Sequence, residues 1–187
     1  MSARTASKAD IPIVRDSEDA DLLAIASIYA HHVIHGFGSF EEVPPGVEEL
    51  TRRRREILGK GLPYLVASDG AGRVLGYAYA SPYRTRSAYR FTVEDSIYVA
   101  PRAARRGVGR LLLEALIERC THAGYRQMIA VIGDSGNDGS IGLHQSLGFA
   151  RAALLPAIGF KRGRWIDCVM MQRPLGAGAG SPPQERR

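Results

Sequence analysis

The sequence predicts a single α/β domain of the α+β kind, in which helices cover a central β-sheet. Short apolar runs typical of strands are interleaved with longer segments whose apolar residues recur at helical spacing. One of these strands, ending near Ala100, passes through a basic glycine turn directly into an amphipathic helix. The chain has 187 residues, which is long enough for one sizeable core and short for two.

The folded domain is expected to span residues 11–175. Residues 1–10 are polar and lack periodicity, and the tail 176–187 has the composition of a disordered segment. The first twenty residues contain no uninterrupted apolar region, so a secretory signal is not expected. Because no stretch approaches the roughly 18 apolar residues of a membrane span, we expect a cytoplasmic protein without a membrane partner.

Before the basic turn, the pattern predicts a short edge strand, two helices and a β-hairpin. The strands are runs bounded by turn residues, and they are expected at residues 11–15, 64–68 and 74–81. The helices start after Asp16 or Ser17 and after Pro44-Pro45, and they are expected at residues 18–34 and 47–58.

From the basic turn onward, the pattern predicts two further helices and the rest of the sheet. The strand from residue 93 is stopped by Pro101, which cannot donate to a ladder. Helices are expected at residues 111–120 and 140–147, the second ended by Gly148. Strands are expected at residues 93–100, 127–132, 149–155 and 165–172, which brings the sheet to about six to seven strands.

The turn between residues 102 and 109 has the composition of an anion site. Three arginines and two glycines lie directly before a leucine-rich helix. Free N–H groups and the positive end of the helix dipole therefore point at one place, with guanidinium groups beside them. A plain strand-to-helix turn is the alternative interpretation.

The window 104–109, Ala-Arg-Arg-Gly-Val-Gly, resembles the acyl-CoA pyrophosphate loop of the GCN5-related N-acetyltransferase (GNAT) superfamily, Gln/Arg-x-x-Gly-x-Gly/Ala. Both glycines match, whereas Ala104 stands where the family has Gln or Arg. The resemblance implies a loop that acts mainly through main-chain N–H groups, with Arg105, Arg106 or Arg110 supplying charge.

A second signature follows in the later helix, where the GNAT pattern is an Asn and then Leu-Tyr-x-x-Leu-Gly-Phe. Here Asn137 is followed by the window 143–149, Leu-His-Gln-Ser-Leu-Gly-Phe, so His144 replaces the usual Tyr. Together with the windows 93–99 and 159–167, this resembles the phosphinothricin and methionine sulfone/sulfoximine N-acetyltransferase branch. The resemblance covers about residues 13–175.

The resemblance implies a GNAT fold, a mixed central sheet flanked by helices and splayed at its central strands to hold acetyl-CoA. It implies transfer of an acetyl group from acetyl-CoA, the co-substrate, to the free amine of a small amino-acid-like acceptor. It also implies a homodimer in which the late strands and acceptor loops meet across the interface.

The residues that match the branch imply which side chains transfer protons. The acceptor's ammonium must lose a proton before it attacks, and a thiolate must leave. Glu94 is expected to act as base, directly or through a water, and His144 as a second base or as acid toward sulfur. The alternatives are a surface glutamate and a histidine that caps the core.

The remaining site residues are expected in two groups. Those contacting acetyl-CoA lie on the central strand, the basic turn and the later helix: Ile97, Tyr98, Val99, Arg105, Arg106, Gly107, Val108, Gly109, Arg110, Asn137 and Ser140. Those contacting the acceptor precede the central strand: Phe40 and Glu41 beside its side chain, and Arg84, Arg86 and Tyr89 at its carboxylate.

Metal binding is not predicted. His31, His32 and His35 cluster in sequence, but no carboxylate or cysteine set accompanies them at ligand spacing. Cys120 and Cys168 lack metal-ligand or Cys-x-x-Cys spacing, and both are expected to be small buried side chains.

The net charge of +6 suits a polyanionic cofactor, a membrane surface or nucleic acid. Nucleic acid is not expected, because no binding motif or aromatic stacking pattern accompanies the arginines. Arg52 to Arg55 fall on a predicted helix, where a solvated face is the expectation.

Two rival functions stay open at this point. One is a GNAT that acetylates a protein terminus, a lysine or a polyamine, although an arginine-rich acceptor loop does not suit a polyamine. The other is a non-catalytic acyl-CoA-binding module, which predicts the loss of proton-transfer residues.

Overall fold

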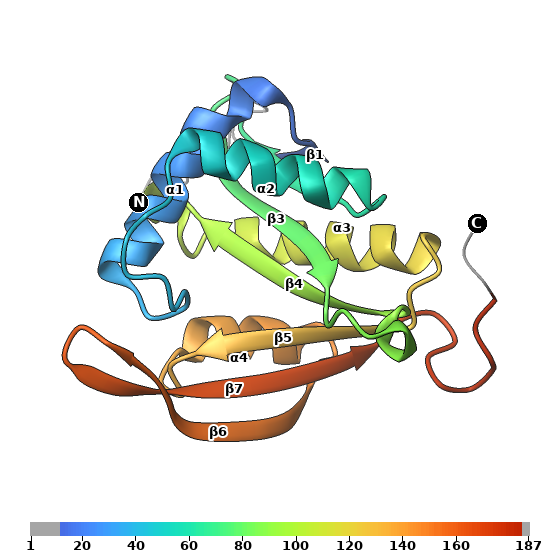
Figure 1. Cartoon of the computed structure of the whole chain (residues 1–187). Coiled ribbons are helices and arrows are strands. Elements are labelled where there is room, and N and C mark those ends of the chain that lie inside the picture. The colour runs from blue at the N-terminus through green and yellow to red at the C-terminus, as the bar shows by residue number, and fades with distance from the viewer. Residues whose placement is uncertain (1–11, 185–187) are drawn as a thin grey trace, which may run out of the picture.

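The computed structural model describes residues 12–184, so the predicted disordered segment 1–10 and residues 185–187 of the tail lie outside the described residues. Its seven strands form one sheet in the order β1-β2-β3-β4-β5-β7-β6 (Figure 1). The strands are β1 Ile13–Asp16, β2 Tyr64–Ser68, β3 Val74–Pro82, β4 Thr92–Val99, β5 Gln127–Gly133, β6 Ala150–Lys161 and β7 Arg164–Pro174. The predicted mixed sheet flanked by helices is confirmed.

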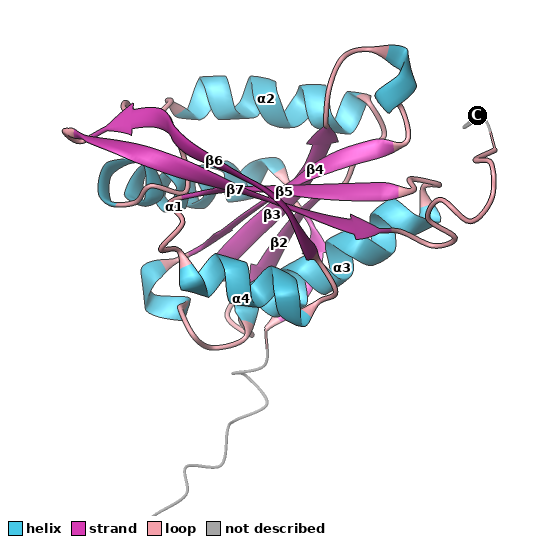
Figure 2. Ribbon diagram, turned by 90° about the horizontal axis from the view of Figure 1, so that it is seen from below, coloured by secondary structure: helices cyan, strands magenta, loops and turns pink. Residues whose placement is uncertain are grey.

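Two helices cover each face of the sheet. The helices are α1 Leu22–His35, α2 Val47–Gly59, α3 Val108–His122 and α4 Asp138–Ser146, and the short 3₁₀ turns are η2 Asp19–Asp21, η3 Ser87–Tyr89 and η4 Pro101–Ala103. Figure 2 shows α1 and α2 on one face and α3 and α4 on the other. Leucines of α3, among them Leu112, Leu113 and Leu116, are fully buried in the core.

The sheet opens at its centre. β4 and β5 are parallel neighbours, and their pairing joins residues 92–95 to residues 127–130. β4 continues to Val99 and β5 to Gly133, and the two strands diverge over these last residues (Figure 1). The predicted splay of the central strands is therefore present, and it begins beside Asp95 and Ala130.

The late hairpin is longer than the sequence predicts. The strand expected to end at residue 155 continues to Lys161, through Pro156. A proline is tolerated here because β6 is the edge strand and has β7 as its neighbour. The pairing register shifts between Leu155 and Gly159, and Ala157 has a φ of 49°. This bulge re-aims the end of the hairpin toward the α1–α2 loop.

Three smaller expectations can be compared with the structure. Cys120 and Cys168 are free and buried, as predicted. Arg54 is not part of a solvated face: it is 9% exposed, and its guanidinium donates to the Ser17 hydroxyl at 2.7 Å and to an Asp19 carboxylate oxygen at 2.7 Å. Helical periodicity alone could not show that this arginine anchors α2 to the β1–α1 connection.

The described part of the tail forms turns against the domain. Arg126 donates through Nε to the Gly178 carbonyl at 2.9 Å and through Nη2 to the Ser181 hydroxyl at 2.7 Å. These contacts hold residues 178–181 beside the start of β5.

No helix within residues 12–184 is long and apolar enough to cross a membrane.

Candidate active site

A cavity of about 1290 Å³ lies where β4 and β5 part. It is lined by both expected proton-transfer residues, Glu94 and His144. The lining also includes most of the expected cofactor and acceptor residues: Phe40, Glu41, Ile97, Tyr98, Val99, Arg105, Gly107, Val108, Gly109, Arg110, Asn137 and Ser140. Residues that are far apart in the sequence therefore line one cavity.

Main-chain groups of β4 face into this hollow. Ala100 N–H donates to the Leu75 carbonyl at 2.8 Å, so this pair is hydrogen bonded across β3 and β4. In an antiparallel pair the bonded residues alternate, which turns the main-chain groups of Ile97 and Val99 away from β3 and toward the gap. The same alternation points the Tyr98 main chain at β3, and Tyr98 is also among the residues that line the cavity.

One of these carbonyls already has a partner. His32 Nε2 donates to the Val99 carbonyl at 2.8 Å. Burial lowers the pKa of His32, which keeps this imidazole neutral near pH 7. The role of His32 was not predicted, because its hydrogen bond joins residues that are 67 positions apart in the sequence. Within residues 12–184 no group of three or more potential metal ligands occurs.

The basic turn is shaped for an anion. Arg105 and Gly107 both have left-handed backbones, with φ of 60° and 80°, and Gly107 precedes the first residue of α3. A Cβ at Gly109 would lie 3.3 Å from Leu143 and 3.5 Å from Val99, so a bare backbone keeps this cradle open. Fifteen residues of α3 start here and direct their dipole at the turn. These features fit a pyrophosphate.

The predicted side chains of the turn lie in different places relative to the cavity. Ala104, which departs from the family pattern, lines the cavity, whereas Arg106 is exposed outside its lining. Arg110 is exposed on α3 and forms an ion pair with Glu114 at 2.9 Å. Arg105 and Arg110 both line the cavity, and the roles of Arg105, Arg106 and Arg110 at a cofactor stay predictions.

The start of α4 is fixed by Asn137. Its side-chain oxygen accepts from the Ser140 N–H at 3.2 Å, an N-cap hydrogen bond. Gly148 follows the helix with a φ of 83°, as the predicted left-handed stop requires. Both Asn137 and Ser140 lie on the cavity, and the cap sets the direction in which α4 presents His144.

The two residues expected to transfer protons lie on opposite sides of β4. Tyr98 packs edge-on against Tyr29 of α1, with ring centroids 4.9 Å apart, so this strand face is turned to α1 and α2. Glu94 has the same parity as Tyr98 and shares that face. Asp95 has the opposite parity and contacts His144 of α4. Glu94 and His144 therefore flank the gap from different sides of the sheet.

Glu94 has an environment that favours its protonated form. Burial raises the pKa of its carboxyl, the neighbouring Asp95 carboxylate raises it further, and Arg84 opposes both. A carboxyl group whose pKa is raised toward neutrality is a more effective general base than an exposed one.

His144 is 3% exposed and bonded at both ring nitrogens. Nδ1 lies 2.7 Å from the Ser140 carbonyl and Nε2 lies 3.0 Å from Asp95 Oδ2. Burial lowers the pKa of His144, but the hydrogen bond and charge of Asp95 outweigh burial and raise it overall. Asp95 was missed by the sequence reasoning, although an acid beside Glu94 was a visible signal.

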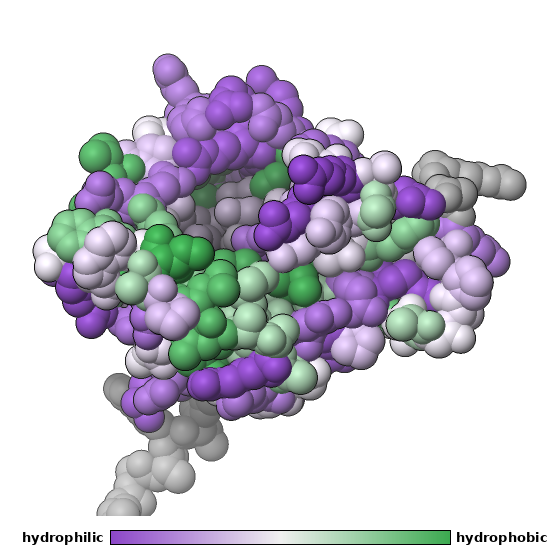
Figure 3. All heavy atoms as spheres, turned by 60° about the horizontal axis from the view of Figure 1, so that its bottom comes forward, coloured by the Kyte–Doolittle hydropathy of each residue, from purple (hydrophilic) through white to green (hydrophobic). Residues whose placement is uncertain are grey.

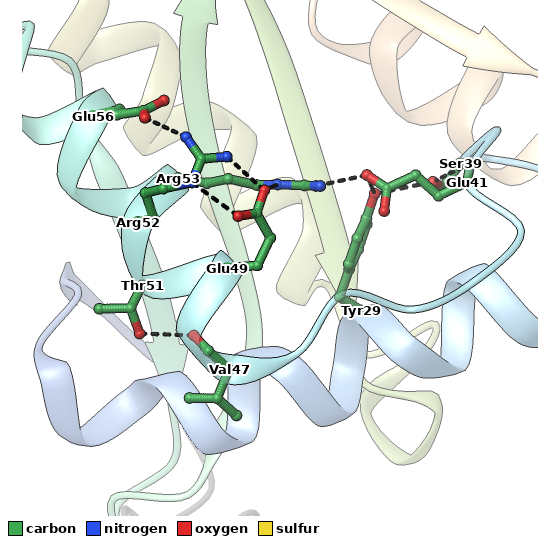
Figure 4. Close-up of polar contacts among 9 residues, drawn as sticks. All are labelled: Tyr29, Ser39, Glu41, Val47, Glu49, Thr51, Arg52, Arg53 and Glu56. Carbon is green, nitrogen blue, oxygen red and sulfur yellow. Dashed lines mark hydrogen bonds and ion pairs between the residues drawn. The ribbon is translucent and has the colours of Figure 1, made fainter.

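The α1–α2 loop brings Glu41 to the cavity. Glu41 Oε1 accepts from the Tyr29 hydroxyl at 3.0 Å and from Arg53 Nη1 at 2.6 Å, and Figure 4 shows both groups pointing at it. Ser39 bonds the Tyr29 hydroxyl at 3.0 Å from the same loop. Glu41 is thus a fixed carboxylate on the α1–α2 side of the cavity.

The same loop is anchored to the late hairpin. Lys161 is 3% exposed, and its Nζ donates to the carbonyls of Gly36 at 3.0 Å and Ser39 at 2.6 Å. A Cβ at Gly159 would come within 2.6 Å of the Phe40 ring, so the loop lies directly on β6. The hairpin therefore determines where Phe40 and Glu41 stand.

Three expected acceptor residues lie outside the cavity lining. Arg84, Arg86 and Tyr89 are exposed on the β3–β4 connection. Arg84 lies over the Tyr83 ring, 5.0 Å from its centroid, and its charge lowers the pKa of Glu94. Arg84 is therefore an electrostatic neighbour of the site, and the roles of all three residues at an acceptor stay predictions.

Comparison with known proteins adds to this geometry. The sequence pattern of the Acetyltransferase (GNAT) family matches residues 23–149. The chain is 57% identical to phosphinothricin N-acetyltransferase of Alcaligenes faecalis over 171 residues, which cover 91% of this chain and 86% of that protein. It is 40% identical to L-methionine sulfoximine/L-methionine sulfone acetyltransferase of Pseudomonas paraeruginosa, covering 90% of this chain and 98% of that protein.

Among solved structures, the fold matches a GNAT superfamily phosphinothricin acetyltransferase from Sinorhizobium meliloti in complex with acetyl-CoA. The TM-score is 0.90 at 50% sequence identity, and the match covers 93% of this chain and 94% of that one.

Proposed function

Because the chain belongs to the GNAT acetyltransferase family, we propose that it transfers the acetyl group of acetyl-CoA to the free amine of a small amino-acid-like acceptor. It is an acyltransferase, and acetyl-CoA is its donor. Phosphinothricin, methionine sulfoximine and methionine sulfone are the candidate acceptors. The observation that carries the assignment of roles is the position of Glu94 and His144 on opposite faces of β4 at the start of the splay.

The residues on the α3–α4 side suit acetyl-CoA. The N–H groups at the start of α3, with Arg105, would hold its pyrophosphate, and the main-chain groups of Ile97 and Val99 would hold the pantetheine arm. When bound, acetyl-CoA supplies the thioester acetyl group and the thiol that leaves. N–H groups of β4 in the gap orient that group and polarise its carbonyl.

Glu94 is assigned as the base. It lies on the face turned to α1 and α2, which is also where Glu41 and Phe40 border the cavity. Its raised pKa suits removal of a proton from the acceptor's ammonium, directly or through a water.

His144 is assigned as the acid that protonates the departing sulfur. It lies on the face turned to α3 and α4, the side of the anion-binding turn. Its raised pKa favours the protonated ring. The protons balance. The ammonium loses two protons when it becomes an amide: Glu94 accepts one, and the other replaces the proton that His144 gives to the sulfur.

A small acceptor suits the α1–α2 side. Lys161 pins the loop that carries Phe40 and Glu41, so this end of the cavity has a fixed border. We assign Arg84, Arg86 and Tyr89 to the acceptor's carboxylate, supported by the electrostatic action of Arg84 on Glu94.

The test is release of free CoA thiol from acetyl-CoA with a panel of acceptors: phosphinothricin, methionine sulfoximine, methionine sulfone, common amino acids, spermidine and a peptide. Turnover confined to the first three acceptors would support the proposal. Turnover with the peptide or spermidine alone would contradict the acceptor class. Binding of acetyl-CoA without turnover on any acceptor would point to a non-catalytic module.

We also propose that the protein is a homodimer joined through the β6–β7 hairpin. Leu154, Ile158, Phe160 and Trp165 are each more than half exposed, and β6 is an edge strand. Figure 3 shows apolar residues gathered on the side of the molecule that is the bottom of Figure 1, where β6 and β7 lie. Light scattering should give twice the monomer mass for the wild type and a monomer for Trp165→Ser; a monomeric wild type would contradict the proposal.

A cytoplasmic location is part of the same proposal, because the donor acetyl-CoA and free amino acids meet there. Cell fractionation tests it, and recovery of the protein outside the cytoplasm would contradict it.

A further inference from the structure

The pair formed by Asp95 and His144 is buried and tightly defined. The side chains of His144 and Asp95 are 4% and 3% exposed, and their contact joins β4 to α4 across the start of the splay. The Phe149 ring packs edge-on against the imidazole, with centroids 5.0 Å apart. These contacts define the resting position of the ring.

The two nearest hydrogen-bond partners of His144 are acceptors, and the Ser140 hydroxyl lies farther from Nδ1, at 3.4 Å. The Ser140 carbonyl at Nδ1 can accept a proton and cannot donate one. An ionised Asp95 carboxylate at Nε2 likewise accepts. Two acceptors on two ring nitrogens are satisfied together when the ring carries both protons, which is the imidazolium.

The second carboxylate oxygen of Asp95, Oδ1, is a further observation about this pair. Within residues 12–184, Asp95 Oδ1 is buried and has no hydrogen-bond partner, and Asp95 lines the cavity. Buried carboxylate oxygens are normally satisfied, and unsatisfied ones concentrate where function requires them. A pair that served stability alone would be expected to satisfy both oxygens.

We propose that Asp95 is a positioning residue of acetyl transfer: it holds His144 doubly protonated, with Nδ1 fixed on the Ser140 carbonyl, and thereby makes His144 the acid of the site. This inference rests on the proposed function and deepens it, because it explains why His144 and not Glu94 supplies the proton. The step breaks the N–H bond at His144 Nε2 and forms the S–H bond of free CoA. For this transfer the Nε2–H must leave Asp95 Oδ2 for the sulfur, and the ring that remains is neutral with its proton at Nδ1.

The surroundings of the pair are consistent with this role. From β4, Asp95 and the neighbouring Glu94 are the acidic groups, and the charge of Asp95 raises the pKa of Glu94. From α4, Ser140 contributes a neutral carbonyl. From β7, the Cys168 thiol lines the cavity, and burial raises its pKa, so it stays neutral near pH 7. Asp95 is thus the charge that decides the state of His144.

The first experiment is NMR of the full-length protein with ¹⁵N-labelled histidine, with the His144 signals assigned by comparison with His144→Gln. In the wild type near pH 7 both ring nitrogens of His144 should carry protons. In Asp95→Asn the carboxylate is replaced by an isosteric amide, and the ring should become singly protonated at Nδ1. A singly protonated His144 in the wild type would overturn the proposal, even if Asp95→Asn failed to fold.

The second experiment is the pH profile of kcat at saturating substrates. Asp95→Asn should lower kcat about 100-fold and move the descending limb to lower pH, since His144 then loses its proton earlier. The matched control is Asp138→Asn, which removes an exposed acid from the first turn of α4 and should leave the limb in place. An unshifted limb in Asp95→Asn would mean a structural role and overturn the proposal.

The two proposals fail separately. If the wild type acetylates no acceptor, the proposed function fails, whereas the NMR result still reports the protonation of His144. If the wild type is active and His144 is singly protonated, the role of Asp95 fails and the acetyltransferase assignment stands.

Discussion

The two sides of the cavity are built in different ways. The α3–α4 side consists of the end of β4, the basic turn and the start of α3, which follow one another in the chain and act largely through main-chain groups. The α1–α2 side consists of the loop that carries Glu41, held by side chains from α2 and from the β6–β7 hairpin. A site built from main-chain groups tolerates changes of side chain, such as Ala104. A loop held by side chains changes its position when one of those side chains is replaced.

The same contrast appears in the electrostatics. On the α1–α2 side, Glu94 is shifted toward its neutral form by burial and by Asp95. On the α3–α4 side, His144 is shifted toward its charged form by Asp95. One buried aspartate thus biases both groups, in the directions that a base and an acid near neutral pH require.

The largest effect should come from Glu94→Gln. Loss of the base should lower kcat about 100- to 10,000-fold, while acetyl-CoA affinity, measured by calorimetry, should stay within about twofold. Glu114→Gln is the control, because Glu114 lies on α3 in an exposed ion pair with Arg110. If Glu94→Gln lost acetyl-CoA affinity as strongly as it lost kcat, Glu94 would belong to the acetyl-CoA side of the cavity, and its assignment to the α1–α2 side would be wrong.

Next in size is a change at Gly107, whose φ of 80° suits glycine. Gly107→Val should cost about 1–2 kcal/mol of stability and weaken acetyl-CoA binding about tenfold, because the N–H groups of the turn lose their direction. No atom lies within 4 Å of the position of a Cβ there, so the effect comes from the backbone. Gly107→Asn tolerates the left-handed conformation and should bind nearly normally; similar weakening in both variants would contradict this account.

Replacing Lys161 should disturb the α1–α2 side of the cavity most directly. Lys161→Met keeps the buried stem but leaves the carbonyls of Gly36 and Ser39 without their donor, at a cost of about 1–3 kcal/mol in unfolding free energy. The KM of the acceptor should rise more than the KM of acetyl-CoA. Arg162→Met is the control, since Arg162 is an exposed cation that donates to the His35 carbonyl at 3.0 Å and lies over the Phe37 ring, 5.6 Å from its centroid, without contacting the carbonyls that Lys161 holds. A larger rise in the KM of acetyl-CoA would reverse the assignment of the two sides.

The smallest effect is expected from Arg84→Met. The Arg84 charge lowers the pKa of Glu94, so its removal should raise that pKa. A base must be deprotonated to act, and the ascending limb of the kcat profile should therefore move to higher pH, by less than about one unit for an exposed charge. A shift to lower pH would show that Arg84 does not act on Glu94.

The sequence was informative wherever the signal is local. The glycine turn before α3 and the stop of α4 at Gly148 depend on neighbouring residues, and both agree with the structure, in which Gly107 and Gly148 have left-handed backbones. Turn residues and periodicity act over a few positions, so they can be read without knowing the fold.

The α1–α2 side was less accessible because its contacts are long-range. Lys161 meets Ser39 across 122 positions, and spacing in sequence carries no sign of this. Arg54 was expected on a solvated face because its neighbours are arginines, yet it is a buried anchor. Asp95 shows the intermediate case, in which the residue type was visible but its partner, His144, became known through packing.

The most direct test of the division between the two sides is the pH profile of kcat for the wild type, Glu94→Gln and His144→Gln, with one acceptor at saturation. We predict that Glu94→Gln loses the ascending limb and keeps the descending one, and that His144→Gln loses the descending limb and keeps the ascending one. Loss of the same limb in both variants would contradict the assignment of a base to one face of β4 and an acid to the other.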